Sequence, residues 1–192
     1  MIDEKNKRLD DQPIKNGIMK AVRETGHVYT AAVDVVSVGV RNTLAAARRA
    51  GSSAVGAVTH VALGAIRGAL EMGSDLIQAG KGIVVGVLHG SGDRGEASLR
   101  TILHTARTVI HHTALTGCDV TSATTGLVEG AIQCAEDTGV NVTRAASAAA
   151  HGALEGAEEV SFAAAEQVRA ALAGPFPGVR IQLLPPYQPQ ER

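Results

Sequence analysis

Small side chains recur at every eleventh position through most of the chain. Eleven residues make three α-helical turns at about 3.67 residues per turn, so this series keeps one line along a helix small. The other apolar positions recur three and four residues apart and do not alternate, which predicts helices and not strands. No member of the series is larger than Val: it reads Val40, Gly51, Ala62, Gly73, Val84, Gly95, Ala106, Gly117, Val128, Gly139, Ala150 and Ser161.

A second line of small residues consists of glycines four residues apart, a spacing that places them on one helix edge. Such glycines also join membrane helices, but the charges of Arg67, Lys81 and Glu129 lie within or beside the line and favour packing between helices in water. The pattern therefore predicts an all-α fold, an undecad-repeat helical bundle or hairpin array with Gly/Ala-rich close helix packing. The glycines are Gly64, Gly68, Gly82, Gly86, Gly90, Gly126, Gly130, Gly152 and Gly156.

Internal repetition and turn signals leave two arrangements open. A shift of four elevens aligns Gly73 and Asp75 with Gly117 and Asp119, which indicates duplication of a helical unit. Residues 90–95 contain three glycines and form the clearest turn signal. Weaker breaks recur where Gly is followed two residues later by Asp, Asn or Ser, because these residues end and begin helices. If all breaks form, helices of about 20 residues, about 30 Å long, pair as antiparallel hairpins. If the chain turns only at residues 90–95, it forms two long helical rods. The eleven-residue period runs without interruption through the weaker breaks, which favours the rods.

Composition divides the chain into three parts. Residues 1–16 are rich in charged side chains and lack an apolar core like that of a signal peptide, so we expect a charged flexible arm. Residues 17–173 form the helical repeat body. Residues 174–192 hold all but one of the six prolines, which stop helices. We expect this apolar, Pro-rich tail to bind a partner through Phe176, Ile181, Leu183, Leu184 and Tyr187.

Histidines and carboxylates supply the only candidate metal ligands. His104 lies two helical turns before His111 and His112, and His151 begins a row with Glu155 and Glu159 at four-residue spacing. A zinc site needs three or four ligands, usually with closer pairs. Glu24 and His27 form one Glu-x-x-His element, whereas di-iron bundles use two. We therefore assign these residues solvated or helix-capping roles and expect no metal or cofactor.

No other catalytic or ligand-binding motif stands out. The chain lacks a Gly-x-Ser-x-Gly element and the full spacing of a phosphate-binding loop. Cys118 and Cys134 do not form a Cys-x-x-Cys pair and are interpreted as small buried side chains. The formal net charge of −1 gives no indication of a nucleic-acid partner. We therefore expect no enzymatic activity and no catalytic residue.

The eleven-residue period between Val28 and Ala173 resembles the undecad repeats of late-embryogenesis-abundant proteins, synucleins and exchangeable apolipoproteins. It is a resemblance of periodicity, because the synuclein KTKEGV consensus and the Lys/Glu-dense repeat are absent. It implies amphipathic helices that fold on membranes or lipid. A lipid-seeking face carries Leu and Phe, whereas this one carries Gly and Ala.

These observations predict a non-enzymatic helical scaffold or assembly protein. We expect it to be cytoplasmic and to form a homo-oligomer, to bind another protein subunit, or both. Two alternatives remain: a peripheral protein that binds a lipid or membrane surface through amphipathic helices, and a histidine–carboxylate metal-binding bundle. The eleven-residue series also predicts that a Leu at Gly117 or Ala106 overpacks a helix contact and costs about 1–3 kcal/mol.

Overall fold

The computed structural model describes residues 28–49, 54–71, 75–174 and 176–183. Within these ranges it is almost entirely helical and contains no strand, which confirms the predicted all-α fold. Seven helices are described: α2 (Val28–Arg49), α3 (Ala54–Glu71), α4 (Leu76–Ser91), α5 (Glu96–Leu115), α6 (Val120–Thr138), α7 (Val142–Glu158) and α8 (Phe162–Leu172).

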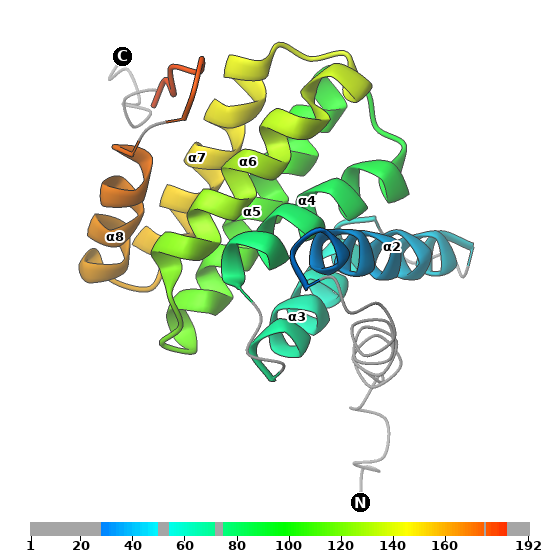
Figure 1. Ribbon diagram of the computed structural model, residues 1–192, viewed down its shortest axis with the longest axis horizontal. Coiled ribbons are helices and arrows are strands. Elements are labelled where there is room, and N and C mark those ends of the chain that lie inside the picture. The colour runs from blue at the N-terminus through cyan, green and yellow to red at the C-terminus, as the bar shows by residue number, and fades with distance from the viewer. Residues whose placement is uncertain (1–27, 50–53, 72–74, 175, 184–192) are drawn as a thin grey trace, which may run out of the picture.

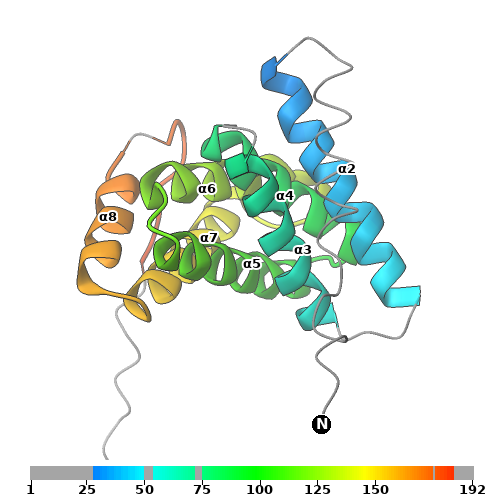
Figure 2. The same cartoon turned by 90° about the horizontal axis from the view of Figure 1, so that it is seen from below.

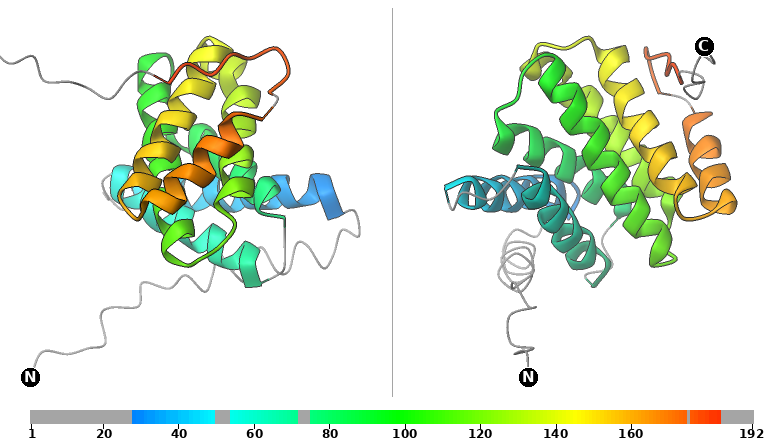
Figure 3. Two further views of the ribbon diagram at one scale, coloured as in Figure 1. Left: turned by 90° about the vertical axis from the view of Figure 1, so that its left-hand side faces the viewer. Right: turned by 180° about the vertical axis from the view of Figure 1, so that it is seen from behind.

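The helices stack in two rows. α2, α4, α6 and α8 follow one another in one row, and α3, α5 and α7 form the other, so each helix packs against the helix two places along the chain. The two rows are visible edge-on in Figure 2, and Figure 3 (right) shows the α5–α7 pair from behind. α2 and α3 lie at one end of the stack and α8 lies at the other (Figure 1). Consecutive helices therefore form hairpins that connect the rows.

Side-chain caps and left-handed residues explain why the helices are short. The side chains of Asp75, Asp119 and Asn141 accept hydrogen bonds from backbone N–H groups at the starts of α4, α6 and α7. Such caps satisfy amides that have no partner within the helix. Gly92 and Gly139 end α4 and α6 in the left-handed conformation. The hairpin arrangement is thus present in the described residues, and the alternative of two long rods is wrong.

In the described residues, the members of the eleven-residue series that lie at helix ends do not pack between helices. One helix and its turn span about 22 residues, as from Val40 to Ala62, so alternate members fall at mid-helix and at a turn. Gly95, Gly117 and Gly139 lie at helix ends with φ values of 58°, 70° and 71°, and a side chain there would have no neighbour within 4 Å. The packing role predicted for these three is wrong. Gly51 and Gly73 lie outside the described residues. The mid-helix members are fully buried: Val40, Ala62, Val84, Ala106, Val128 and Ala150.

The close helix contacts come from the glycines spaced by four. Six of them face a backbone carbonyl of the preceding helix in their row, and in these six contacts the two residues are 49 positions apart, as from Lys81 to Gly130. A Cβ atom at Gly130 would lie 2.8 Å from the Lys81 carbonyl oxygen, closer than real Cβ atoms approach. Glycine therefore lets the two backbones touch, in the geometry of Cα–H···O contacts. The pairs are Val33 and Gly82, Ser37 and Gly86, Ile77 and Gly126, Lys81 and Gly130, Leu103 and Gly152, and Arg107 and Gly156.

Larger aliphatic side chains are buried in the core of the stack. Ile83 and Leu88 of α4, Ile102 and Ile110 of α5, and Leu127 of α6 are at most 2% exposed. Six alanines of α7 are fully buried, so this helix approaches its neighbours closely along most of its length.

Replacing Gly126 by Ala tests the backbone contact with α4. An Ala normally stabilises a helix interior by about 1 kcal/mol relative to Gly. Here the added methyl group overlaps the Ile77 carbonyl, so we expect a net loss of about 1–3 kcal/mol in the free energy of unfolding, measured by urea denaturation. Gly139→Asn serves as the control and should be close to neutral, because Asn tolerates the left-handed conformation. A gain in stability for Gly126→Ala would contradict the assigned contact.

The position of Gly117 changes the expected effect of substitution there. Because the surroundings are open and φ is 70°, the cost comes from backbone strain and not from side-chain size. Gly117→Ala and Gly117→Leu should therefore lose similar amounts, about 1–2 kcal/mol each, and Gly117→Asn should lose less. Thermal melting of the three variants checks this order. A Leu much more harmful than Ala would restore the overpacking interpretation.

Candidate functional site

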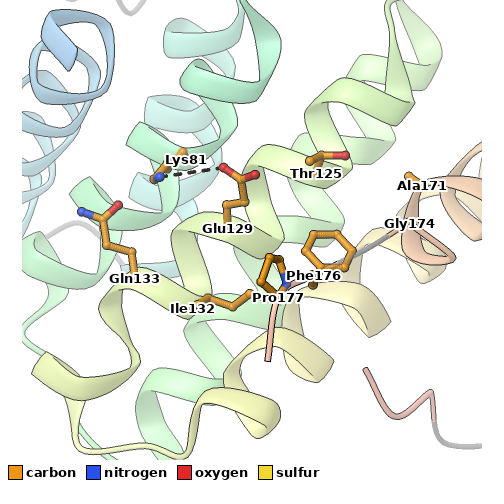
Figure 4. Close-up of a pocket in the computed structure, with 9 residues that line it drawn as sticks. All are labelled: Lys81, Thr125, Glu129, Ile132, Gln133, Ala171, Gly174, Phe176 and Pro177. Carbon is orange, nitrogen blue, oxygen red and sulfur yellow. Dashed lines mark ion pairs between the residues drawn. The ribbon is translucent and has the colours of Figure 1, made fainter. Parts of the chain in front are cut away.

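A pocket of about 390 Å³ lies between α6 and the end of α8. Figure 4 shows Ile132 and Gln133 of α6 on one side and Phe176 and Pro177, which follow α8, on the other. Its polar rim includes Lys81, whose Nζ atom lies 3.8 Å from Oε2 of Glu129. Both side chains are partly exposed, and such a pair contributes about 0–1 kcal/mol. The remaining lining residues are Thr125, Ala171 and Gly174.

The pocket occupies a place that a neighbouring helix fills earlier in the same row. Residues 44 positions apart are equivalent, as Asp75 and Asp119 are at the starts of α4 and α6. In α2, Ser37 faces Gly86 of α4, and Arg41 and Leu44 face Gly90. The residues of α6 that line the pocket lie 88 positions, or two steps of 44, after these residues of α2. The next helix in the row, α8, ends before it covers them. The equivalent pairs are Ser37 and Thr125, Arg41 and Glu129, and Leu44 and Ile132.

The described part of the tail packs on its own chain. Phe176, Val179 and Ile181 are partly buried against the helical core. The backbone N–H of Gln182 donates a hydrogen bond of 3.0 Å to Oγ of Ser147 in α7. The apolar surfaces of Phe176 and Ile181 are thus partly covered by their own chain, and their binding to a partner stays a prediction. Leu183 is 41% exposed, and Leu184 and Tyr187 lie outside the described residues.

Ion pairs follow the same register along the outer edges of both rows. In five pairs the two partners are 48 positions apart, one less than in the glycine contacts. The pairs Lys81–Glu129 and Arg107–Glu155 therefore lie next to a glycine–carbonyl contact. Arg107 of α5 also pairs with Glu159, beyond α7. Exposed pairs of this kind add little stability, but their common spacing fixes which helix edges meet. The pairs are Lys81 and Glu129, His89 and Asp137, Glu96 and Arg144, Arg107 and Glu155, and His111 and Glu159.

The histidine–carboxylate candidates do not form a metal centre in the described residues. Nδ1 of His111 lies 3.3 Å from Oε2 of Glu159, but no group of three or more His, Cys, Asp or Glu in the described ranges could hold a metal ion. Nε2 of His104 is buried and finds no hydrogen-bond partner there. Glu24 and His27 lie outside these ranges. The metal-binding alternative therefore has no supporting geometry in this part of the chain.

The two cysteines differ in exposure. Cys134 in α6 is buried, as predicted, and burial followed by the nearby charge of Asp137 raises the pKa of its thiol to about 11. Cys118 is only partly buried, which corrects the prediction for that residue, and its Sγ lies 3.2 Å from Oγ1 of Thr116. The arrangement of Cys134 is therefore the opposite of that of a reactive thiolate, which requires a lowered pKa.

Comparisons with models of protein families, with curated proteins and with solved structures give no match for this chain. Among the described helices, none is both long enough and apolar enough to cross a membrane.

Sequence reasoning did not identify the pocket. Lys81 and Glu129 were recognised only as charges beside the glycine line, although their separation of 48 positions is a signal that the repeat carries. The sequence identifies Phe176 only as an apolar residue of the tail. Its place beside the pocket depends on the direction that the chain takes after α8. Residues 176–183 follow a proline-rich break and have no helical period from which that direction can be read.

His112 makes the stability of the stack dependent on pH. Burial, and then the positive charges of His111 and Arg67, lower the pKa of His112 from its ordinary value of 6.5. Well above pH 6.5 both folded and unfolded chains hold the neutral imidazole, so this group contributes no pH dependence. As the pH falls through 6.5, the unfolded chain takes up the proton first, and the folded state loses stability. We expect His112→Gln to reduce this loss in urea denaturation series from about pH 7 to 5. His60→Gln, at an exposed site, is the control, and equal slopes for wild type and His112→Gln would contradict the assignment.

Proposed function

We propose that the protein is a non-enzymatic helical scaffold that binds other protein subunits. The observation that supports this most is the constant 49-residue register of backbone contacts, which stacks helix pairs in two rows. Stacked helix pairs of this kind characterise α-solenoid proteins, which use their extended surfaces for binding. A fold alone does not specify a partner, so the proposal also needs a site.

The pocket beside α6 supplies that site. It exposes Ile132, Phe176 and Pro177 together with polar groups of Thr125, Glu129 and Gln133, the mixture typical of ligand pockets of this size. Because α2 and α4 bind a helix at the equivalent positions, we propose that a helical segment of a partner inserts small or apolar side chains here. The acidic residues Glu136 and Asp137 are exposed farther along α6, which favours a partner segment with basic residues.

The lipid-binding alternative receives less support. The alternative was based on the eleven-residue series. The mid-helix members of that series are fully buried inside the stack: Ala62, Val84, Ala106, Val128 and Ala150. A lipid surface could reach them only if the helices separated. That opening would expose the core and break the glycine contacts, at a free-energy cost that the small side chains recover poorly on insertion into lipid.

Filling the pocket tests the proposed function. Thr125 lines the pocket, and Thr121 lies one turn earlier on α6 with its side chain exposed. We expect protein subunits to co-purify with the native chain and with Thr121→Phe, but to be lost with Thr125→Phe. Equal melting temperatures of the two variants would show that the difference reflects binding and not folding.

Two outcomes would overturn the scaffold proposal. One is purification of the native chain without any other subunit from the cells that make it. The other is flotation of the protein with anionic vesicles accompanied by a change in its helical circular dichroism signal, which would favour the lipid-binding alternative. A scaffold should stay away from the vesicles and keep the same spectrum.

A further inference from the structure

The outward side of α8 is the strongest candidate for an interaction surface outside the pocket. Phe162 is 79% exposed, the highest value among the exposed large apolar side chains in the described residues. Glu166, Ala170 and Ala173 follow it and are also exposed. Spacings of three and four residues place all of them on one side of the helix. The opposite side is buried against α6 and α7 through Ala164, Ala165, Val168 and Ala171.

Large and small side chains lie at opposite ends of this surface. Phe162 begins α8, whereas the exposed Ala170 and Ala173 lie at its end and have no side-chain atom beyond Cβ. Eleven residues of helix span about 16 Å, so Phe162 cannot cover these alanines in its own chain. A second α8 running antiparallel would bring its Phe162 onto Ala173, and the same contact would form again at the other end.

The charges on α8 fit the same antiparallel alignment. Glu166 and Arg169 pair within the helix at 2.7 Å, and Arg169 also pairs with Glu158 at 2.7 Å. An alignment that sets Phe162 opposite Ala173 also sets Glu166 of one chain opposite Arg169 of the other. The two pairings lie on the same edge of the helix, because 162, 166, 169 and 173 are spaced by three and four. Apolar and charged contacts therefore select one register.

We propose that the outward side of α8 binds α8 of a second copy of this chain, as an antiparallel pair about a twofold axis. A surface that carries a large apolar side chain at one end and small side chains at the other can pair with a second copy of itself, as a twofold interface requires. Phe162 is the central apolar contact, and Glu166 and Arg169 set the register. The inference goes beyond the proposed function, because a monomeric chain could also bind a partner subunit in the pocket.

Sedimentation of the full chain over a wide range of concentrations tests the pairing. The wild-type chain should form a particle of twice its 19.7 kDa mass. Phe162→Ser should raise the dissociation constant of this dimer by roughly tenfold or more, as expected for loss of a central aromatic contact. Leu115→Ser is the matched control, because Leu115 is also a largely exposed apolar residue but lies at the end of α5. It should leave the dimer unchanged, and both variants should melt close to wild type.

Charge reversal gives a second test that does not depend on removing apolar surface. Glu166→Arg places Arg opposite Arg169 of the second chain, and Arg169→Glu places Glu opposite Glu166, so each variant alone should remain monomeric. A mixture of the two variants restores opposite charges at both positions and should dimerise.

Three results would overturn the pairing. They are a wild-type chain that stays monomeric at all concentrations, equal effects of Phe162→Ser and Leu115→Ser, and a mixture of the charge variants that does not associate. Subunits that still co-purify with the monomeric Phe162→Ser variant would leave the scaffold proposal standing.

Discussion

Backbone-to-backbone contact between helices two places apart is the constraint on which this structure depends. Gly126 and Gly130 set α6 against carbonyls of α4, and Gly152 and Gly156 do the same for α7 on α5. A helix that touches its neighbour through Cα atoms loses the freedom to rotate or slide, because any side chain that entered the contact would clash. The burial of alanines in α7 and the ion pairs along the outer edges both follow from the register that these glycines impose.

The junction between α3 and α5 lacks the kind of glycine contact found at the α2–α4, α4–α6 and α5–α7 junctions, because α5 contains no glycine. In α5, Thr108 and His112 lie 44 positions before Gly152 and Gly156, so they occupy the glycine positions on the edge that faces α3. An imidazole there excludes backbone contact of the glycine type and brings a titratable group close to Arg67 of α3. The α3–α5 junction is therefore the place where protonation and helix packing are coupled. The α4–α6 and α5–α7 junctions have no such group at the contact itself.

Much of the local structure could be predicted from the sequence because its signals are short-range. Asp75, Asp119 and Asn141 mark helix starts through their own side-chain hydrogen bonds, and the glycines spaced by four mark an edge that meets another helix. The eleven-residue series was misleading because its period is half that of a helix and its turn. Gly117 therefore has the same phase as Ala106 although it lies in a turn. An eleven-residue period fits a continuous helix, and it fits equally well a series of hairpins that repeat every 22 residues. Only the backbone conformation, such as the positive φ of Gly117, shows which of the two is present.

What the sequence could not predict is how the row ends. Ala170 and Gly174 lie 44 positions after Gly126 and Gly130, so the repeat predicts that they face α6. Ala170 is instead exposed, Gly174 borders the open pocket, and α8 buries its other side against α6 and α7. The reason is that α8 ends at Leu172, too soon to cover the second half of α6, and the chain after it places only the partly buried Phe176, Val179 and Ile181 against the core. This one departure leaves the pocket beside Ile132 open and turns a small-residue surface of α8 outward. α8 and the residues after it therefore both cover the end of the core and border the two surfaces from which binding is proposed.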